Sequence, residues 1–179
     1  LVEYIKKEYS LNLLHISINN EVDTTSYSWG LDRIDQTDLP LSESPFNPPY
    51  TGKNVDIFVL DTGIQKNHKE FTDRVTTGKN IINTAPATYD DSGHGTACAS
   101  VAAGATVGVA RNALLHPVKV LDYRGVGSIW SVLQGIQWVM LNAVKTSILS
   151  LSLGTHGNTI LDDAVMEASK TDRKSTRLN

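Results

Sequence analysis

A short apolar run that ends in an acid constrains this sequence most: residues 55–60, Val-Asp-Ile-Phe-Val-Leu, come directly before Asp61. Their β-branched and aromatic side chains are typical of a strand that is buried on both faces, as in a parallel sheet. Further strand and helix patterns alternate along the chain, the strands at 80–82, 114–121 and 148–153 and the helices at 94–103, 129–144 and 160–169. This alternation predicts an α/β fold with a parallel sheet sandwiched by helices.

Two of the expected helices have recognisable N-terminal caps. Ser128 precedes the helix expected at 129–144 and is a preferred capping residue. Thr159 precedes the helix expected at 160–169, and Asp162 completes a capping box with it. We therefore expect these two helices to begin where the pattern places them.

The residues before the first buried strand fall into two parts. Residues 1–25 begin with an expected strand over 2–5 and end in a polar run that is typical of a linker. Residues 27–53 contain several prolines, which prevent long helices and paired strands. We expect residues 27–53 to form loops over the surface of the domain.

Composition excludes several classes of protein. With 40% hydrophobic and 20% charged side chains and a net charge of −3, the chain is typical of a globular domain and carries no field that favours nucleic acid. No apolar run approaches the roughly 18 residues of a membrane helix. The single cysteine, Cys98, excludes an internal disulfide framework.

Asp61 is a candidate functional residue because ligands gather at the carboxyl ends of the strands in a parallel sheet. Two other interpretations stay open. Asp61 can simply begin a turn with Thr62 and Gly63. An apolar run followed by Asp-Thr-Gly is also the signature of aspartic proteases, which need a second copy or a homodimer of a mainly β chain.

The second candidate is His94, within Asp90-Asp91-Ser92-Gly93-His94-Gly95-Thr96. The glycines on both sides allow close approach of the backbone, and the alanine-rich run that follows predicts a helix that begins at His94. The positive end of that helix disfavours imidazolium, which helps keep His94 neutral as a general base. Asp61 is the natural partner for its Nδ1 atom.

A metal site and a structural role are the competing interpretations of these residues. Asp61, His68, His94 and Asp91 can be drawn as zinc ligands, although their spacing matches no compact zinc motif. Cys98 follows His94 by one helical turn and either lies near the site or is a small buried hydrophobe. The remaining histidines have no comparable context, and we interpret them as structural or exposed: His15, His68, His116 and His156.

The two candidate blocks and three further motifs resemble, in the same order, those of the subtilisin-like serine proteases, and within them the proteinase K-like group. The motifs are Trp-Gly-Leu-Asp-Arg-Ile at 29–34, Val-Leu-Asp-Thr-Gly-Ile at 59–64, Gly-His-Gly-Thr-Ala-Cys-Ala at 93–99, Val-Lys-Val-Leu-Asp at 118–122 and Ser-Leu-Ser-Leu-Gly at 150–154. The resemblance implies a three-layer fold, truncated before its C-terminal part. It implies catalytic roles for Asp61 and His94 in an Asp-His-Ser triad of a serine endopeptidase.

The resemblance also implies a division of the chain. Residues 1–25 resemble the end of an inhibitory propeptide with its junction, and cleavage is expected near residues 25–27. Residues 26–170 resemble the N-terminal part of the peptidase domain, and residues 171–179 turn basic and are interpreted as a truncated or non-native tail. Two segments resemble those that hold an extended peptide substrate: Gly125, Val126 and Gly127, and Ser152, Leu153 and Gly154.

The nucleophile is the main departure from the family pattern. The oxyanion-hole asparagine and the block Gly-Thr-Ser-Met-Ala of the family lie beyond the helix expected at 160–169, and this sequence contains neither. We expect the 179 residues alone to be inactive, and a binding-only pseudoprotease is the alternative. We also expect the strands at 118–121 and 148–153 to be partly uncovered, which predicts poor stability or aggregation.

Four further expectations follow from the resemblance. The protein is expected to be secreted and monomeric, and to act on protein or peptide substrates. Its own propeptide is expected to inhibit it within the molecule. The chemistry requires no cofactor, and a structural calcium ion is allowed, for which the sequence supplies no ligand set.

Overall fold

A computed structural model describes residues 10–13, 29–42, 44–144, 146–170 and 174–177. The helices are α1 (Trp29–Ile34), α2 (His94–Ala103), α3 (Ile129–Asn142) and α4 (Thr159–Lys170). The strands are β1 (Ser10–Leu13), β2 (Asp56–Asp61), β3 (Lys79–Asn80), β4 (Leu114–Lys119), β5 (Val126–Ser128), β6 (Ser147–Leu151), β7 (Leu153–Gly154) and β8 (Lys174–Arg177). The strand expected over 2–5 and the junction expected near 25–27 lie outside the described residues.

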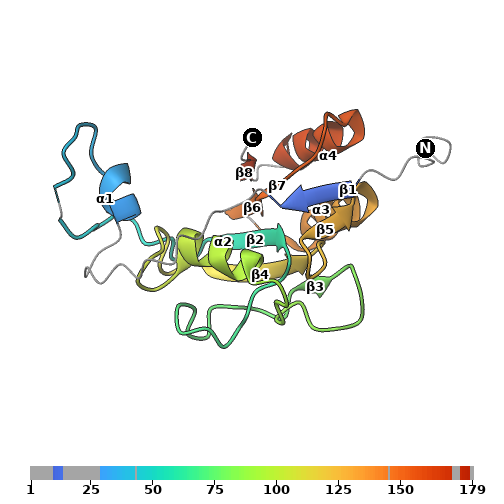
Figure 1. Cartoon of the computed structure of the whole chain (residues 1–179), viewed down its shortest axis with the longest axis horizontal. Coiled ribbons are helices and arrows are strands. Elements are labelled where there is room, and N and C mark those ends of the chain that lie inside the picture. The colour runs from blue at the N-terminus through green and yellow to red at the C-terminus, as the bar shows by residue number, and fades with distance from the viewer. Residues whose placement is uncertain (1–9, 14–28, 43, 145, 171–173, 178–179) are drawn as a thin grey trace.

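The main sheet has five parallel strands in the order β3-β4-β2-β6-β8 (Figure 1). Strand β2 lies at the centre, where Asp56 to Asp61 pair with Leu114 to Lys119 of β4. On its other side, Ile57 is opposite Ile148 of β6. Because all these strands run in one direction, their carboxyl ends share one edge of the sheet, and Asp61 lies there.

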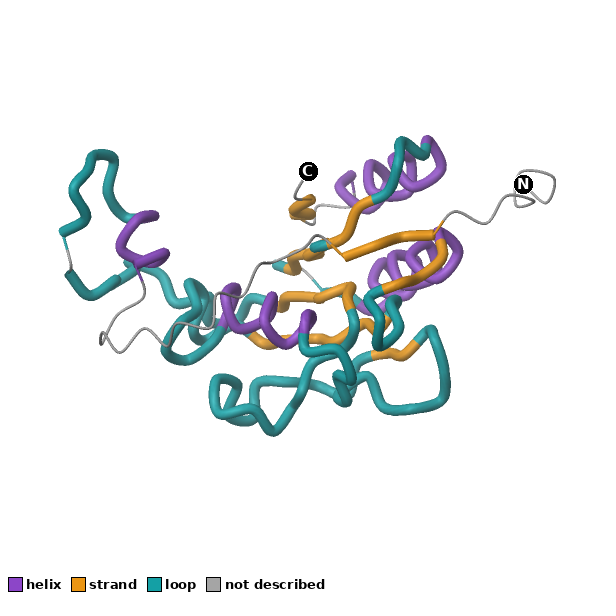
Figure 2. The backbone as a smooth tube through the Cα atoms, in the orientation of Figure 1, coloured by secondary structure: helices purple, strands orange, loops and turns teal. Residues whose placement is uncertain are grey.

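Alternate side chains of β2 face two different hydrophobic clusters, because successive residues of a strand point to opposite faces. Phe58 and Leu60 pack with residues of α3 and α4 on one face. Ile57 and Val59 pack with Ala99 of α2 on the other face. The sheet is therefore the middle of three layers, with α2 on one side and α3 on the other (Figure 2). The prediction of a parallel sheet sandwiched by helices is confirmed.

The helix caps agree with the sequence in one case and differ in the other. Ser128 caps α3 by accepting a hydrogen bond from the backbone N–H of Ser131 at 3.0 Å, as expected. Helix α4 already includes Thr159, and Asn158 accepts from the N–H of Leu161 at 3.1 Å. The expected cap at Thr159 is therefore wrong by one residue, because the asparagine before it offers a carbonyl oxygen with the required reach.

A second, three-stranded sheet has the order β5-β1-β7, and both pairings are antiparallel. Strand β1 lies between two segments that are far apart in the sequence (Figure 1). Asn12 is opposite Val126 on one side and Gly154 on the other. The N-terminal segment of this chain is thus inserted as the central strand of a small sheet.

Three other findings differ from the sequence expectations. Helix α1 lies in the region 27–53, where only loops were expected. Strand β8 pairs in parallel with β6, so part of the basic tail extends the sheet. The strands expected to be uncovered are mostly buried: Ile148 is half-buried, and their other apolar residues are at most 4% exposed, namely Val118, Val120, Leu121, Leu149, Leu151 and Leu153.

None of the helices in the described part of the chain has both the length and the apolar character that a membrane span needs.

Candidate active site

Asp61 is the last residue of β2 and is fully buried. One of its carboxylate oxygens, Oδ1, accepts a hydrogen bond from the backbone N–H of Thr62 at 2.7 Å. The neighbouring strand β4 ends beside it, since Lys119 is opposite Asp61 in the parallel register. The central strand therefore delivers a carboxylate to the carboxyl edge of the sheet in one fixed orientation.

His94 is the first residue of α2, as the sequence predicted. Gly93 precedes it with φ of 90°, a left-handed conformation that glycine adopts without strain. Gly95 follows it, and a Cβ at Gly95 would lie 2.1 Å from the carbonyl oxygen of Gly63. The two glycines thus serve different purposes: Gly93 turns the chain into the helix, and Gly95 allows the helix to contact the end of β2.

The structure brings the two candidate residues together. The Nδ1 atom of His94 lies 2.8 Å from Oδ1 and 2.9 Å from Oδ2 of Asp61. An ionised carboxylate can only accept, so Nδ1 carries the hydrogen and donates it to Asp61. The other ring nitrogen, Nε2, then has a free lone pair when the ring is neutral, which is the requirement for a general base.

The surroundings of His94 favour its protonated form. The hydrogen bond to Asp61 raises the pKa of His94 most, and the contact with Cys98 raises it further, against the opposing effect of burial. The sequence led us to expect that the helix N-terminus would keep His94 neutral. The Asp61 carboxylate outweighs that effect, because a directly bonded full charge acts more strongly than the partial charge at a helix end.

An acid at the end of a central parallel strand, paired with a histidine at the start of the next helix, can be compared with known proteins. The profile of the subtilase family matches residues 52–178. The chain belongs to the subtilase family. The prediction of the family from the sequence motifs is therefore confirmed.

Individual relatives agree with this assignment. The chain is 46% identical over 141 residues to the extracellular serine proteinase of Thermus sp. (strain Rt41A), a match that covers 79% of this chain and 34% of that protein. It is 37% identical over 167 residues to alkaline serine exoprotease A of Vibrio alginolyticus, covering 93% of this chain and 31% of that protein. The chain therefore spans about a third of the length of these relatives.

The fold is shared with a solved structure described as a cold adapted subtilisin-like serine proteinase. The TM-score is 0.80 at 37% sequence identity, and the match covers 84% of this chain and 55% of that chain. A mainly β fold is thus excluded, and Asp61 is bonded to a histidine rather than to a second aspartate. The interpretation of Asp61 in this subtilase as part of an aspartic-protease signature is wrong.

Cys98 lies beside the pair, one turn along α2 from His94. Its Sγ atom is 3.7 Å from Nδ1 and 3.8 Å from Nε2 of His94. Among the described residues, the groups close enough to hold one metal ion are Asp61, His94 and Cys98, within 4.8 Å of one another. The zinc set drawn from the sequence with His68 and Asp91 is not brought together.

The two segments predicted to bind substrate lie on either side of β1. Gly125, with φ of 73°, completes a turn in which its N–H donates to the carbonyl oxygen of Asp122 at 3.0 Å. Val126 and Gly127 then enter β5 and pair with β1. In the other segment Leu153 and Gly154 form β7 and pair with β1, whereas Ser152 lies between β6 and β7. Their role in substrate binding stays a prediction.

The other described histidines have ordinary structural environments. The ring of His116 stacks on Phe58 with centroids 4.3 Å apart, and its Nδ1 atom lies 3.1 Å from the hydroxyl of Thr76. His68 and His156 are exposed. His15 lies outside the described residues.

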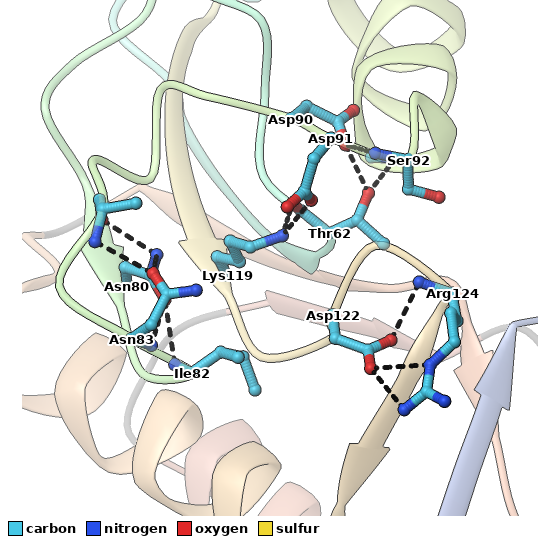
Figure 3. A network of polar contacts seen from close by, with 12 residues as sticks. Thr62, Asn80, Ile82, Asn83, Asp90, Asp91, Ser92, Lys119, Asp122 and Arg124 are labelled. Atoms are coloured by element: carbon cyan, nitrogen blue, oxygen red, sulfur yellow. Dashed lines mark hydrogen bonds and ion pairs between the residues drawn. The ribbon is translucent and has the colours of Figure 1, made fainter.

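Sequence reasoning gave no role to Asp90 and Lys119, two residues beside the pair. Asp90 and Lys119 both bind Thr62, the residue after Asp61, through its hydroxyl and its carbonyl oxygen respectively (Figure 3). Lys119 is 1% exposed, which is rare for a lysine and marks a specific partner. A further signal was present in the sequence: Asp90 precedes a helix whose cap position, Gly93, has no side chain with which to cap it.

Proposed function

We propose that the protein to which this chain belongs is a serine endopeptidase that uses an Asp-His-Ser triad. The bidentate contact between Asp61 and Nδ1 of His94 is the observation that carries this proposal. His94 Nε2 accepts the hydroxyl proton of a serine from outside these 179 residues, and the serine oxygen attacks the peptide carbonyl. His94 then gives the proton to the leaving amine, and water releases the acyl group by the same exchange.

Asp61 has two roles in this reaction. It fixes the tautomer of His94, because its oxygens only accept and therefore hold the ring hydrogen on Nδ1. It also stabilises the imidazolium that forms as His94 takes the serine proton, which is the direction of the pKa change described above. Neither role transfers a proton to Asp61 itself.

The test of this mechanism uses the full-length protein and a peptide substrate. His94→Ala is expected to abolish turnover, and a serine-directed phosphonate is expected to inactivate the wild-type protein. His68→Ala, an exposed histidine that lies against Phe71, is the matched control and should retain activity. Unchanged activity in His94→Ala would show that the mechanism is wrong.

A peptide-binding protein without turnover is the second candidate function. The small sheet supports it, because β5 and β7 pair with an extended segment on both of its sides. Sequencing the gene beyond the codon for Asn179 separates the two functions. A reading frame that continues into Gly-Thr-Ser-Met-Ala supports the peptidase, and a stop codon supports binding alone.

The position of the N-terminal strand β1 supports the proposed inhibition by a propeptide. It also indicates where in the molecule this segment binds. The last propeptide strand was expected over 2–5, whereas the strand in the structure is β1, between β5 and β7. An extended peptide added to these two edges is the mode of binding expected for substrate. We infer that Ser10–Leu13 occupies the place of a substrate peptide.

This inference is tested with a synthetic peptide of residues 1–25, added to the mature enzyme. Asn12 is paired on both sides, so Asn12→Pro removes its backbone N–H and is expected to weaken inhibition at least about tenfold. Asn12→Ala keeps the N–H and is the matched control. Equal inhibition by both peptides would contradict the insertion of β1 into the substrate site.

Other parts of the proposal rest on family membership. We propose residues 26–170 as the peptidase part, secretion of the protein, and a monomeric state. A structural calcium ion would need about six or more oxygen ligands. The cluster of Asp61, His94 and Cys98 does not fit it, since one ligand is sulfur and one is nitrogen. The proposed chemistry needs protein side chains and water, and it requires no cofactor.

A further inference from the structure

Asp90 is not part of the Asp61 and His94 pair, yet its carboxylate accepts an unusually large number of hydrogen bonds. Its Oδ1 atom accepts from the hydroxyl of Thr62 at 2.8 Å and from the N–H groups of Ser92 and Gly93 at 3.1 and 2.9 Å. Its Oδ2 atom accepts from the N–H and the hydroxyl of Thr96, at 2.9 and 2.5 Å. Five donors therefore meet one carboxylate.

These donors come from both elements that carry the pair. Thr62 directly follows Asp61 at the end of β2, and Thr96 lies in the first turn of α2, two residues after His94. Asp90 is thus a single group bonded to both sides of the Asp61 to His94 contact. Burial alone would raise the pKa of Asp90, but the hydrogen bonds, led by that from the Thr96 hydroxyl, lower it. The carboxylate is therefore ionised and only accepts.

Thr62 is held in place from three directions. Its hydroxyl donates to Asp90 and accepts from the N–H of Gly95 at 3.0 Å. Its own N–H donates to Asp61 at 2.7 Å. Its carbonyl oxygen accepts from Nζ of Lys119 at 2.6 Å, and Figure 3 shows the same lysine bound to Asp91. Thr62 follows Asp61 in the sequence and Gly95 follows His94, and a hydrogen bond thus joins these two neighbours of the pair.

The pair depends on such a link because its two members come from separate elements and are 33 residues apart in the sequence. The contact at 2.8 and 2.9 Å to both carboxylate oxygens requires α2 and β2 to keep one relative position. A displacement of about 1 Å in a catalytic group can cost about a hundredfold in rate. A group that joins the two elements beside the reacting atoms therefore affects the chemistry.

We infer that Asp90 is a positioning residue that sets the geometry of the Asp61 to His94 pair by binding Thr62 and the first turn of α2. The inference rests on the proposed peptidase function. Asp90 acts on the reaction through Thr62 and Thr96, to which its carboxylate is hydrogen-bonded, and not by contact with the imidazole ring of His94.

The variants of Asp90 and Thr62 separate the effect of the positions of Asp61 and His94 from the effect of the charge of Asp90. Asp90→Asn keeps the shape but presents an amide N–H₂ to donors that need an acceptor, and it also removes a charge near His94. Thr62→Val removes the bridging hydroxyl without any change of charge, and Thr62→Ser restores that hydroxyl. Asp61 and Cys98 contact His94, whereas Asp90 and Lys119 bind Thr62, and Asp91 binds Lys119. All five charged or titratable groups stay unchanged in the Thr62 variants.

A matched control lies at the far end of the same helix. Glu70 is 5% exposed and accepts from the N–H and hydroxyl of Thr106 at 2.8 and 2.5 Å, in the same manner as Asp90 accepts from Thr96. Its carboxylate binds Thr106 and Val107 rather than Thr62 or His94. Glu70→Gln therefore reports what the loss of an equivalent structural carboxylate does to the molecule.

The experiment measures the kinetics of the full-length protein and, separately, the NMR titration of the His94 ring, assigned with His94→Ala. We expect Asp90→Asn and Thr62→Val each to lower kcat about 10- to 100-fold with little change in KM, and to lower the pKa of His94. Thr62→Ser is expected to recover most of the kcat, and Glu70→Gln to leave kcat within about twofold. The double variant should lose less than the product of the two single losses.

Two results would overturn the inference. The first is that Thr62→Val has the same kcat and the same pKa of His94 as Glu70→Gln, when the two variants have lost equal free energy of unfolding. The other is full additivity of Asp90→Asn and Thr62→Val. Failure of the peptidase proposal gives a different result: the wild-type protein shows no His94-dependent turnover, while the NMR titration still reports whether Asp90 and Thr62 set the environment of His94.

Discussion

Helix α2 is fixed at both ends by charged groups that lie outside it, and the two ends can be compared directly. At the N-terminal end the Asp90 carboxylate accepts from Thr96, which suits the positive end of the helix. At the C-terminal end the Arg74 guanidinium donates to the carbonyl oxygen of Ala103 at 2.7 Å, which suits the negative end. Both contacts fix the helix on the sheet.

The difference between the ends lies in what else each charged group binds. Arg74 also donates to the carbonyl oxygens of Ala113 and Glu70, at 3.1 and 2.7 Å, and so ties backbone to backbone. Asp90 instead binds Thr62, beside the pair. The comparison teaches that a charged group bound to a helix end can support stability alone, as Arg74 does, or also hold neighbouring residues of a candidate site, as we infer for Asp90.

The largest expected effect comes from the pair itself. Asp61→Asn keeps the size of the side chain but can present an N–H₂ group to Nδ1, which favours the wrong tautomer of His94. We expect kcat to fall about 10⁴-fold, as in other serine proteases with such a triad. Steady-state kinetics on the full-length protein measure this loss. A fall of less than tenfold would contradict the orienting role of Asp61.

The next effect concerns the contact between α2 and β2 at the N-terminal end. Gly95→Ala places a Cβ 2.1 Å from the carbonyl oxygen of Gly63, so backbone must move. We expect a loss of about 2–3 kcal/mol in the free energy of unfolding, together with reduced activity. Urea denaturation measures it.

Gly157→Ala is the control for that substitution, because a Cβ at Gly157 meets nothing within 4 Å. It should change the free energy of unfolding by about 0.5 kcal/mol or less. Similar losses in both variants would show that helix contact is not the reason for glycine at position 95.

A third prediction tests the C-terminal end. Arg74→Met removes hydrogen bonds to three carbonyl oxygens, those of Glu70, Ala103 and Ala113. We expect a loss of at least about 2 kcal/mol in stability, since one hydrogen bond that involves a charged group contributes about 1.5–3 kcal/mol net of its exchange with water. The pKa of His94 should not change, and a change would show that the two ends of α2 are coupled.

The last prediction is a pH dependence of the free energy of unfolding. The pKa of His94 is raised above its ordinary value of 6.5, chiefly by Asp61. The protonated pair therefore stabilises the fold fully below about pH 6.5, and this contribution is lost as pH rises through the pKa of the folded protein. The slope is at most about 1.4 kcal/mol per pH unit.

Urea denaturation of wild type and Asp61→Asn across this range measures that contribution, because other titrating groups cancel in the difference. The stability advantage of the wild type should shrink as pH rises above 6.5. An advantage that is constant or grows with pH would contradict the stated direction of the His94 pKa.

The expectations that the structure confirms are those that depend on residues close together in the sequence. The expected bounds of α2 agree with the structure, and Ser128 caps α3, because both follow from neighbouring residues. The cap of α4 was misplaced by one residue. Helix α1 was missed because the proline-rich region around it has no helical period.

The sequence by itself determined the alternating α/β pattern and the two residues, Asp61 and His94, whose local contexts are characteristic of subtilases. Apolar periodicity, glycine and capping residues act over a few positions, and so they can be read along the chain. Only the tertiary structure decided that Asp90 and Lys119 meet at Thr62, and that β1 lies between β5 and β7. These contacts join residues that are distant in sequence, and polar pairing across such distances leaves no period in the sequence.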